Sequence, residues 1–372
     1  MNFAKLKNKL KSNIKNIPGW STDRKIVVFE SDDWGSNTIA SKEHYQKLLE
    51  MGVPVDRSSF NRYDTIERSS DLEALFEILS SVKDASGNPA VFTPFVNLAN
   101  PDFERIKESG YQEYYYESFD KTLEKYGERE DVLELYRQGI DAGLFKPQFH
   151  GREHLAVPLW LKYLQQGNDE IRKAFEQKYY SYPAEGLPSL AGSFRPAFYF
   201  ESDSDLPFLR KSIREGTDLF EELFGYRATV FDPPNGVFSS SLERYLWEAD
   251  IHTIVANRFR PEPVGNGEVK KKFYSFGKTN NLGQTYYIRT CQFELYNNTS
   301  VDDCLSMIRA AFRWGKPAII CTHRVNYNGG IDVTNRDHGL KELGKLLGEI
   351  VKKWPDVEFM SSGDFAEVLR ED

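Results

Sequence analysis

The sequence contains few cysteines, no long apolar run and no surplus of positive charge. Its three cysteines, Cys291, Cys304 and Cys321, are an odd number without metal or redox spacing, so we expect neither a disulfide framework nor a cysteine-based metal site. No stretch approaches the roughly 20 apolar residues of a membrane-spanning helix. A formal net charge of -8 argues against a nucleic-acid-binding protein, which normally presents a basic surface. Because no apolar export signal is recognisable either, we expect a cytoplasmic protein.

The first 24 residues are basic and differ from the rest of the chain. Within residues 1–17, lysines alternate with apolar residues at helical spacing. One interpretation is a leading helix docked on the body of the protein, which the thin apolar face favours. The other is a basic amphipathic helix that contacts an anionic membrane surface. We therefore expect a basic helical extension over residues 1–24 and a single domain over residues 25–372.

From residue 25 onward, short apolar runs alternate with longer segments of helical periodicity. The runs are mostly rich in Val, Ile, Phe or Thr and predict strands over Lys25–Glu30, Ala90–Val96, Lys146–His150, Arg227–Phe231, His252–Ala256, Tyr286–Thr290 and Ala318–Thr322. Helices are predicted over Ser70–Val82, Leu155–Gln165, Lys211–Phe224, Ser240–Glu248, Val301–Trp314 and Leu340–Lys353. This alternation favours parallel βα units, arranged in a barrel or a doubly wound sheet.

Two carboxylates and two imidazoles follow predicted strands. Asp32 and Asp33 come directly after the first strand, where α/β enzymes commonly place their chemistry. Adjacent carboxylates repel each other unless a cation offsets their charge. His150 and His154 follow a later strand, and a helical turn from Gly151 to Leu155 would put both rings on one face. One carboxylate and two imidazoles are a typical ligand set for a catalytic divalent metal, with a second carboxylate left as a base.

His323 ends another predicted strand and would lie at the same edge of the sheet. With an ordinary pKa near 6.5, a histidine there suits proton donation to a leaving group. A simple structural role in a strand-end turn is the alternative interpretation. His44, His252 and His338 have no comparable context.

In this order, the motifs resemble those of the polysaccharide deacetylase family, the NodB-like family 4 carbohydrate esterases. The family's Asp-Asp motif is similar to Asp32-Asp33, its His-x-x-x-His motif to His150–His154, and its late strand-end histidine to Cys321-Thr322-His323. Its Arg/Pro-Pro-Tyr-Gly turn is similar to residues 231–236, Phe-Asp-Pro-Pro-Asn-Gly. Residues 357–365 resemble the family's final strand and helix.

The resemblance implies a distorted (β/α)7 barrel with insertions and a divalent metal, in the first place Zn²⁺, with Ni²⁺ or Co²⁺ as alternatives. By position, Asp33, His150 and His154 would hold the metal, Asp32 would be the general base and His323 the general acid. The implied substrate is an acetylated sugar or glycan precursor. The metal would polarise the acetyl carbonyl and lower the pKa of its water.

The sequence departs from the family pattern in three places. The first two motifs are unusually far apart, so residues 36–89 and 97–143 must contain insertions. Asp232 stands where the family usually has an arginine that keeps the base ionised, and Arg195 or Arg324 are the candidates to replace it. The acidic residue that orients the late histidine has no clear match, with Glu294 and Asp232 as candidates. We expect Trp34, Asn235 and Tyr327 to be the residues that contact a sugar ring.

Two other functions stay open from the sequence. A glycoside hydrolase on a related barrel would use Glu30 or Asp32 as nucleophile and another carboxylate as acid. A degenerate barrel that binds a glycan or a partner protein without turnover is the second alternative.

Overall fold

Seven parallel strand positions form a ring at the centre of the molecule. The computed structural model describes residues 13, 15–126, 131–182, 186–188 and 192–371. Within them, the ring order follows the chain: β1 (Lys25–Trp34), β2 (Phe92–Val96), β5 (Gln148–Phe149), β6 (Val230–Phe231), β7 (Thr253–Val255), β11 (Thr285–Tyr287) with β12 (Cys291–Gln292), and β13 (Ala318–His323). Each neighbouring pair in this order is parallel.

The ring closes through one interrupted strand position. β11 pairs with β7, and four residues further along β12 pairs with β13, which in turn pairs with β1. Residues 285–292 therefore connect both open edges of the sheet. The expected distorted (β/α)7 barrel is confirmed, and all seven predicted strands are its ring members. Two of them, β5 and β6, have only two residues each, so the ring is irregular on that side.

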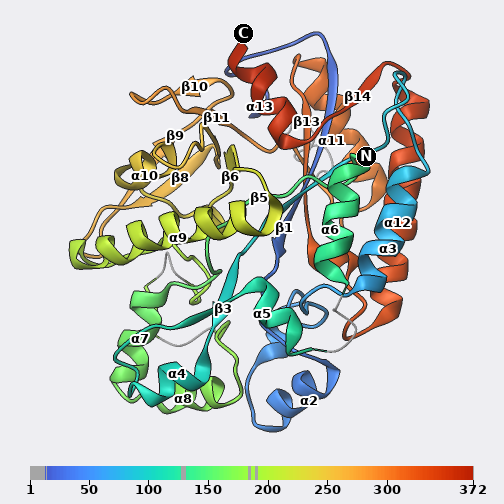
Figure 1. Cartoon of the computed structure of the whole chain (residues 1–372). Helices are drawn as coiled ribbons and strands as arrows, with labels where there is room; N and C mark the ends of the chain where they lie inside the picture. Colours follow the sequence, from blue (N-terminus) through green and yellow to red (C-terminus); the bar gives the residue numbers. More distant parts are fainter. Residues whose placement is uncertain (1–12, 14, 127–130, 183–185, 189–191, 372) are drawn as a thin grey trace, which may run out of the picture.

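Helices cover the outside of the ring and also gather at one end of it (Figure 1). The outer helices are α3 (Ser69–Ser80), α6 (Val132–Asp141), α9 (Leu206–Phe224), α10 (Glu243–Trp247), α11 (Val301–Arg313) and α12 (Val333–Lys353). α13 (Ser362–Glu371) lies at the opposite end of the ring, where Phe365 packs with Ile26 and Val28 of β1. α3 contacts α6 and α12, and α11 contacts α12. Each predicted helix is present, although α12 begins seven residues earlier than expected. Its first turn is polar, and the Asp332 side chain caps it by accepting from the Thr334 N–H.

The expected insertions build the end of the barrel at which the parallel strands finish. Residues 36–89 contribute α2 (Lys42–Glu50) and η1 (Val55–Arg57) there. Residues 97–143 contribute the ribbon β3 (Ala99–Pro101) and β4 (Tyr116–Ser118), with α4 (Phe103–Glu108) and α5 (Phe119–Glu124). α7 (Val157–Gln165) and α8 (Asp169–Glu176) join them in the lower part of Figure 1.

Further short strands extend the structure elsewhere. β14 (Val357–Phe359) pairs with the start of β1, and β10 (Lys278–Thr279) pairs with β11. β8 (Phe259–Pro263) and β9 (Val269–Phe273) form a hairpin beside the barrel. The remaining 3-10 turns are η2 (Asp203–Asp205), η3 (Pro234–Gly236), η4 (Ser240–Leu242), η5 (Leu295–Asn297) and η6 (Arg324–Tyr327).

None of the described helices has the length and apolar character that a membrane crossing requires. Most of the basic stretch over residues 1–17, including the surface that would contact a membrane, lies outside the described residues. The single domain over residues 25–372 stays a prediction.

Candidate metal centre and active site

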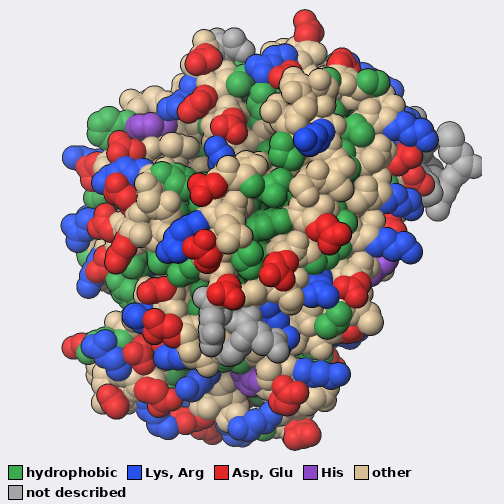
Figure 2. All heavy atoms as spheres, turned by 45° about the vertical axis from the view of Figure 1, so that its right-hand side comes forward, with side chains coloured by type: hydrophobic (Ala, Val, Ile, Leu, Met, Phe, Trp, Pro, Cys, Tyr) green, Lys and Arg blue, Asp and Glu red, His purple; other side chains and the backbone are tan. Residues whose placement is uncertain are grey.

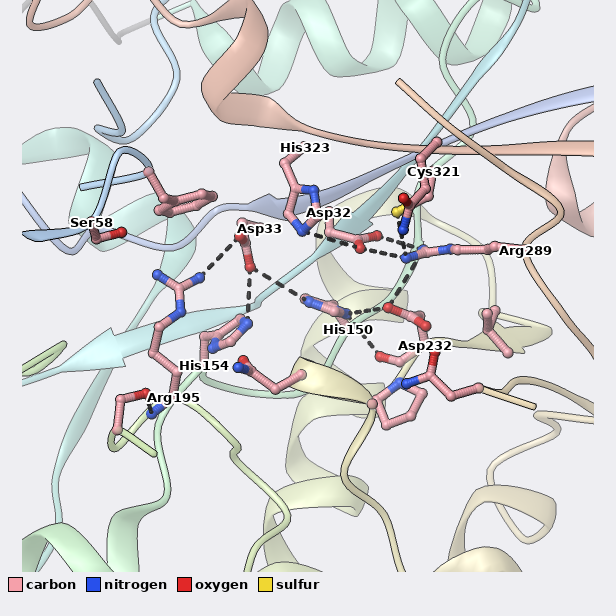
Figure 3. A pocket seen from close by; sticks show the side chains of 18 of the residues that line it. Asp32, Asp33, Ser58, His150, His154, Arg195, Asp232, Arg289, Cys321 and His323 are labelled. Atoms are coloured by element: carbon pink, nitrogen blue, oxygen red, sulfur yellow. Dashed lines mark hydrogen bonds and ion pairs between the residues drawn. The ribbon is translucent and has the colours of Figure 1, made fainter. Parts of the chain in front are cut away.

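A cavity of about 760 Å³ opens at the C-terminal ends of the ring strands. Its polar lining comes from strand ends that are far apart in the sequence: Asp32 and Asp33 from β1, His150 after β5, Asp232 after β6, Arg289 after β11, and His323 from β13. Figure 3 shows these side chains converging from different strands. The barrel therefore places the sequence motifs at one site, as their positions after strands predicted.

A backbone kink allows both aspartates of β1 to face this cavity. Successive side chains of a regular strand point to opposite faces of the sheet. Asp33, however, has a φ of 73°, in the left-handed region that aspartate tolerates better than most residues. The pairing of β1 with β2 is irregular between Ser31 and Trp34, which marks the same kink. Asp32 and Asp33 consequently both line the cavity.

Asp33 lies between two histidines and one arginine (Figure 3). Its Oδ1 is 2.9 Å from Nε2 of His154 and 3.7 Å from Nε2 of His150. Its Oδ2 is 2.9 Å from Nη2 of Arg195. One ligand atom from each of Asp33, His150 and His154 lies within 4.8 Å of the others. Burial opposes the charge of Asp33, but Arg195 and His154 hold its pKa well below the ordinary value.

The two histidines meet through a loop and not through the predicted helical turn. Residues 150–156 are irregular, and Gly151 has a φ of 114°. Backbone hydrogen bonds fix this segment, since Leu98 and Ala99 donate to the carbonyls of Gly151 and Arg152. The two imidazole centroids are 5.2 Å apart. The predicted helical turn was therefore wrong. The two rings nevertheless lie close together, as that turn was expected to place them.

The two rings differ in their hydrogen bonds and in the direction of their pKa shifts. His150 Nδ1 is 2.8 Å from the carbonyl oxygen of Asp232, so Nδ1–H donates there and Nε2 is directed towards Asp33. Burial and the nearby Arg195 lower the pKa of His154 to about 4, which keeps its ring neutral at pH 7. Burial lowers the pKa of His150, but Asp33 and Asp32 raise it more, so this ring would give up a proton when a metal binds. A carboxylate with two imidazoles fits a divalent metal such as Zn²⁺ and leaves coordination positions open. These three side chains could therefore hold the expected metal.

Asp32 has a different environment from Asp33. Arg289 donates from Nη1 and Nη2 to the two carboxylate oxygens of Asp32, both at 2.6 Å, and from Nε to Glu30 at 2.6 Å. Burial raises the pKa of Asp32, but Arg289 and His323 lower it more, so the group stays ionised. Arg289 thus supplies the charge for which Arg195 and Arg324 were the candidates. Its position at the end of a buried strand was the available sequence signal.

His323 is held by Glu294 and faces Asp32. Its Nδ1 is 2.7 Å from Glu294 Oε1, and its Nε2 is 3.7 Å from Asp32 Oδ2. Asn326 donates to the other Glu294 oxygen at 3.0 Å. Burial lowers the pKa of His323, but Glu294 and Asp32 raise it more, to about 10. Of the two candidates for the orienting acid, Glu294 is the one that contacts His323.

Three side chains expected at the site lie elsewhere. Trp34 is 1% exposed, donates to Ser31 Oγ and packs edge-on against Phe145, so it belongs to the core. Tyr327 is also buried and pairs with Thr322. Arg324 is buried between Asp64 and Glu67, at 2.9 and 2.7 Å, where it joins the insertion over residues 36–89 to the end of β13.

The other expected residues do line the cavity. Arg195 contacts Asp33 and not Asp32, and its guanidinium stacks over Phe60 at 4.6 Å. Asp232 lies 3.4 Å from both Arg289 and His150, and burial raises its pKa to about 7. Asn235, with a φ of 56°, follows it in the turn η3.

Comparison with solved structures gives distant similarities over most of the chain. A protein described as a polysaccharide deacetylase from Mycobacterium smegmatis has 15% identity and a TM-score of 0.44, covering 95% of this chain and 93% of that one. The 4-alpha-glucanotransferase of Thermococcus litoralis has 13% identity and a TM-score of 0.45, covering 92% and 40%. A variant of peptidoglycan deacetylase PdaC from Bacillus subtilis has 10% identity and a TM-score of 0.38, covering 94% and 92%. These TM-scores are too low to transfer a function. No curated protein matches the chain.

A sequence-family model gives a broader assignment. The model of glycosyl hydrolase family 57 matches residues 51–297, about two thirds of the chain. This range includes His150, His154 and Arg289, whereas Asp32, Asp33 and His323 lie outside it. The family differs from the one that the motifs resemble, so the resemblance to the polysaccharide deacetylases is confirmed for the barrel fold, and membership of that family stays a prediction. By the extent of the match, the chain belongs to glycosyl hydrolase family 57.

Proposed function

We propose that this protein is a metal-dependent hydrolase that removes an N- or O-linked acetyl group from a carbohydrate or glycan precursor. Membership of a glycosyl hydrolase family supports the broader class, a carbohydrate-active hydrolase. The observation that carries the finer proposal is the arrangement around the adjacent aspartates. Asp33 meets two imidazoles, while Asp32 is held ionised beside them and faces a histidine on the opposite strand.

The residues divide the reaction between them. Asp33, His150 and His154 would hold the divalent metal, which when bound polarises the acetyl carbonyl. Asp32 takes a proton from the water whose oxygen attacks the carbonyl carbon. His323 gives its proton to the departing nitrogen or oxygen as the bond to the acetyl carbon breaks. The products are acetate and the free amine or alcohol of the sugar.

The environments of Asp32 and His323 support these roles. A general base must be ionised, and the Arg289 ion pair lowers the pKa of Asp32. A general acid must carry a proton at working pH, and Glu294 raises the pKa of His323 to about 10. The two groups are close enough to act on one bond, since His323 Nε2 is 3.7 Å from Asp32 Oδ2.

Glycoside hydrolysis is the second candidate, and two observations favour it: the family match and a pair of carboxylates near Arg289. Nη2 of Arg289 lies 2.6 Å from Asp32 Oδ1 and 3.4 Å from Asp232 Oδ2, so these oxygens are at most about 6 Å apart, near the short spacing of retaining glycosidases. Glu30, the other expected nucleophile, is fully buried, is held by Tyr287, Arg289 and Ser362, and does not line the cavity.

One pair of assays separates the two candidates. The purified protein is assayed for acetate release from acetylated sugars and for hydrolysis of glycosides, each before and after exhaustive chelation and after Zn²⁺ is restored. We expect acetate release that chelation abolishes and Zn²⁺ restores. Glycoside hydrolysis that survives chelation would replace our proposal with the second candidate. Metal binding without turnover of either substrate class would leave a glycan-binding barrel.

A further inference from the structure

The cavity has a surplus of positive charge in a protein whose net charge is -8. Three carboxylates line it among the described residues, namely Asp32, Asp33 and Asp232. Five cations line it: Lys15, Arg57, Arg195, Arg258 and Arg289. Arg195 and Arg289 are paired with the three carboxylates. On the face shown in Figure 2, by contrast, acidic and basic side chains are interspersed. The surplus therefore belongs to the cavity and is not a feature of that face.

Arg258 is the centre of this unpaired charge. It follows β7 and lines the cavity, and its Nη2 donates to the carbonyl of Lys15. Its Nε and Nη1 are buried, and neither has a hydrogen-bond partner among the described residues. A buried donor without an acceptor is unfavourable, and more so when it is charged. The described chain therefore leaves two donors of this guanidinium without an acceptor, beside the cavity that Arg258 lines.

Two lysines lie close to this guanidinium. Lys15 lines the same cavity, and Lys316 is buried, with Nζ donating to the carbonyls of Gly19 and Trp20. Among the described residues, Lys15, Arg258 and Lys316 have no carboxylate within 4.0 Å. Residues 1–12 contain no Asp or Glu that could supply one. Burial and mutual repulsion lower the pKa of Lys316, and burial lowers that of Arg258, as expected for cations without a counter-ion.

Lys15 and Arg258 line the cavity together with Arg289, Cys321 and His323. Arg258 follows β7, which pairs with β11, and Arg289 follows β11. Cys321 Sγ in turn is 3.3 Å from Arg289 Nη1 and 3.7 Å from Glu294 Oε1, the partner of His323. In the proposed reaction, His323 faces the leaving group, which is the sugar. An anion bound by the cluster would therefore belong to the sugar and not to the acyl group.

We infer that the substrate is a phosphorylated sugar, either a sugar phosphate or a sugar linked through a diphosphate, whose phosphate binds Arg258 and Lys15. Guanidinium and ammonium groups together are well suited to phosphate oxygens. A cavity of about 760 Å³ has room for a sugar and its phosphate substituent beside the metal residues. This inference rests on the proposed function for the identity of the sugar as leaving group, but the phosphate site itself can be tested without turnover.

The first test measures binding alone. N-acetylglucosamine, its 1-phosphate and UDP-linked N-acetylglucosamine are titrated calorimetrically into the purified protein, with UDP as a further probe. We expect the phosphorylated forms to bind at least about 10-fold more tightly than the neutral sugar, and less tightly as salt is raised. The difference between 1-phosphate and diphosphate distinguishes the two sources of the phosphate. Equal binding of the neutral and phosphorylated sugars would overturn the inference.

Variants then locate the anion. Arg258→Gln and Lys15→Gln should each weaken binding of the phosphorylated sugar about 10- to 100-fold, the value of a charge-assisted hydrogen bond. Lys270→Gln, an exposed lysine of β9 on the neighbouring hairpin, is the matched control and should bind as the wild type does. Arg258→Lys keeps the charge and should restore part of the affinity, which separates loss of charge from misfolding. Unchanged affinity in both glutamine variants would contradict the proposed site.

The phosphate could instead bind the metal, and the same titration after chelation separates the two. We expect the phosphorylated probes to keep their dependence on Arg258 without the metal. Binding that disappears on chelation and ignores Arg258→Gln would overturn the inference and leave the proposed deacetylation intact. Conversely, the protein could bind the phosphorylated probes through Arg258 and yet release no acetate. That result would contradict the proposed reaction and leave the phosphate site intact.

Discussion

Asp32 and Asp33 are chemically identical and adjacent, yet the two sides of the cavity make them different groups. Asp33 faces two imidazoles, of which His154 is neutral at pH 7, and its second oxygen is bound to Arg195. Asp32 faces a bidentate guanidinium and a histidine whose pKa is raised to about 10. One side can hold a cation, while the other already contains one. The environment, and not the residue type, therefore separates the proposed metal ligand from the proposed proton acceptor.

The largest expected effect comes from removing an imidazole on the Asp33 side. His150→Ala or His154→Ala leaves two ligands, so metal binding and acetate release should both fall by about 10³-fold or more. Metal titration and the acetate assay on the same preparations test this. His252→Ala, which alters a histidine outside the cavity, is the control. Full metal affinity in either cavity variant would remove that histidine from the metal site.

A smaller effect is expected from neutralising the other aspartate without changing its shape. Asp32→Asn keeps the size of the side chain but removes the proton acceptor, so the turnover number should fall about 10²- to 10⁴-fold. Metal affinity should stay within a few-fold of the wild type, because Asp32 is on the Arg289 side. A loss of metal as large as that in His150→Ala would show that the two sides are not separate.

The smallest effect should appear as a shift in pH dependence. Because the proposed reaction needs His323 protonated, activity should fall as pH rises through its pKa of about 10. Glu294→Gln removes the charge that raises this pKa. The alkaline limb of the pH–activity profile should therefore move to lower pH by at least about one unit, with little change in activity at pH 6. Glu268→Gln on the exposed hairpin is the matched control. An unmoved limb would mean that another group donates the proton.

Much of the barrel could be predicted from the sequence, because each ring strand is a short apolar run covered on both faces. The ends of those runs also located Asp32, Asp33, His150 and His323 at one edge. The contacts beyond these could not be derived. The kink at Asp33 and the loop that joins His150 to His154 depend on backbone pairing with other strands. Helical spacing therefore predicted that the two imidazoles converge, but for the wrong reason.

The arginines that pair with the buried carboxylates could not be assigned from the sequence either. Arg195, Arg289 and Arg324 each follow or interrupt an irregular segment, and the sequence could not rank them as partners of Asp32. In the chain, Arg195 is 162 residues from Asp33, and Arg289 is 257 residues from Asp32. Arg324 is 260 residues from Asp64. Trp34 was expected at the sugar because it follows the aspartates, but the chain after the kink turns it into the core against Phe145.

The most direct test of the account is the metal content of two single variants measured side by side. Wild type, Asp32→Asn and Asp33→Asn are loaded with Zn²⁺, freed of excess metal and analysed for bound zinc per chain. We predict about one ion in the wild type and in Asp32→Asn, and strongly reduced zinc in Asp33→Asn. Equal zinc in the two variants, whether retained or lost, would contradict the division of the cavity into a metal side and a proton-transfer side.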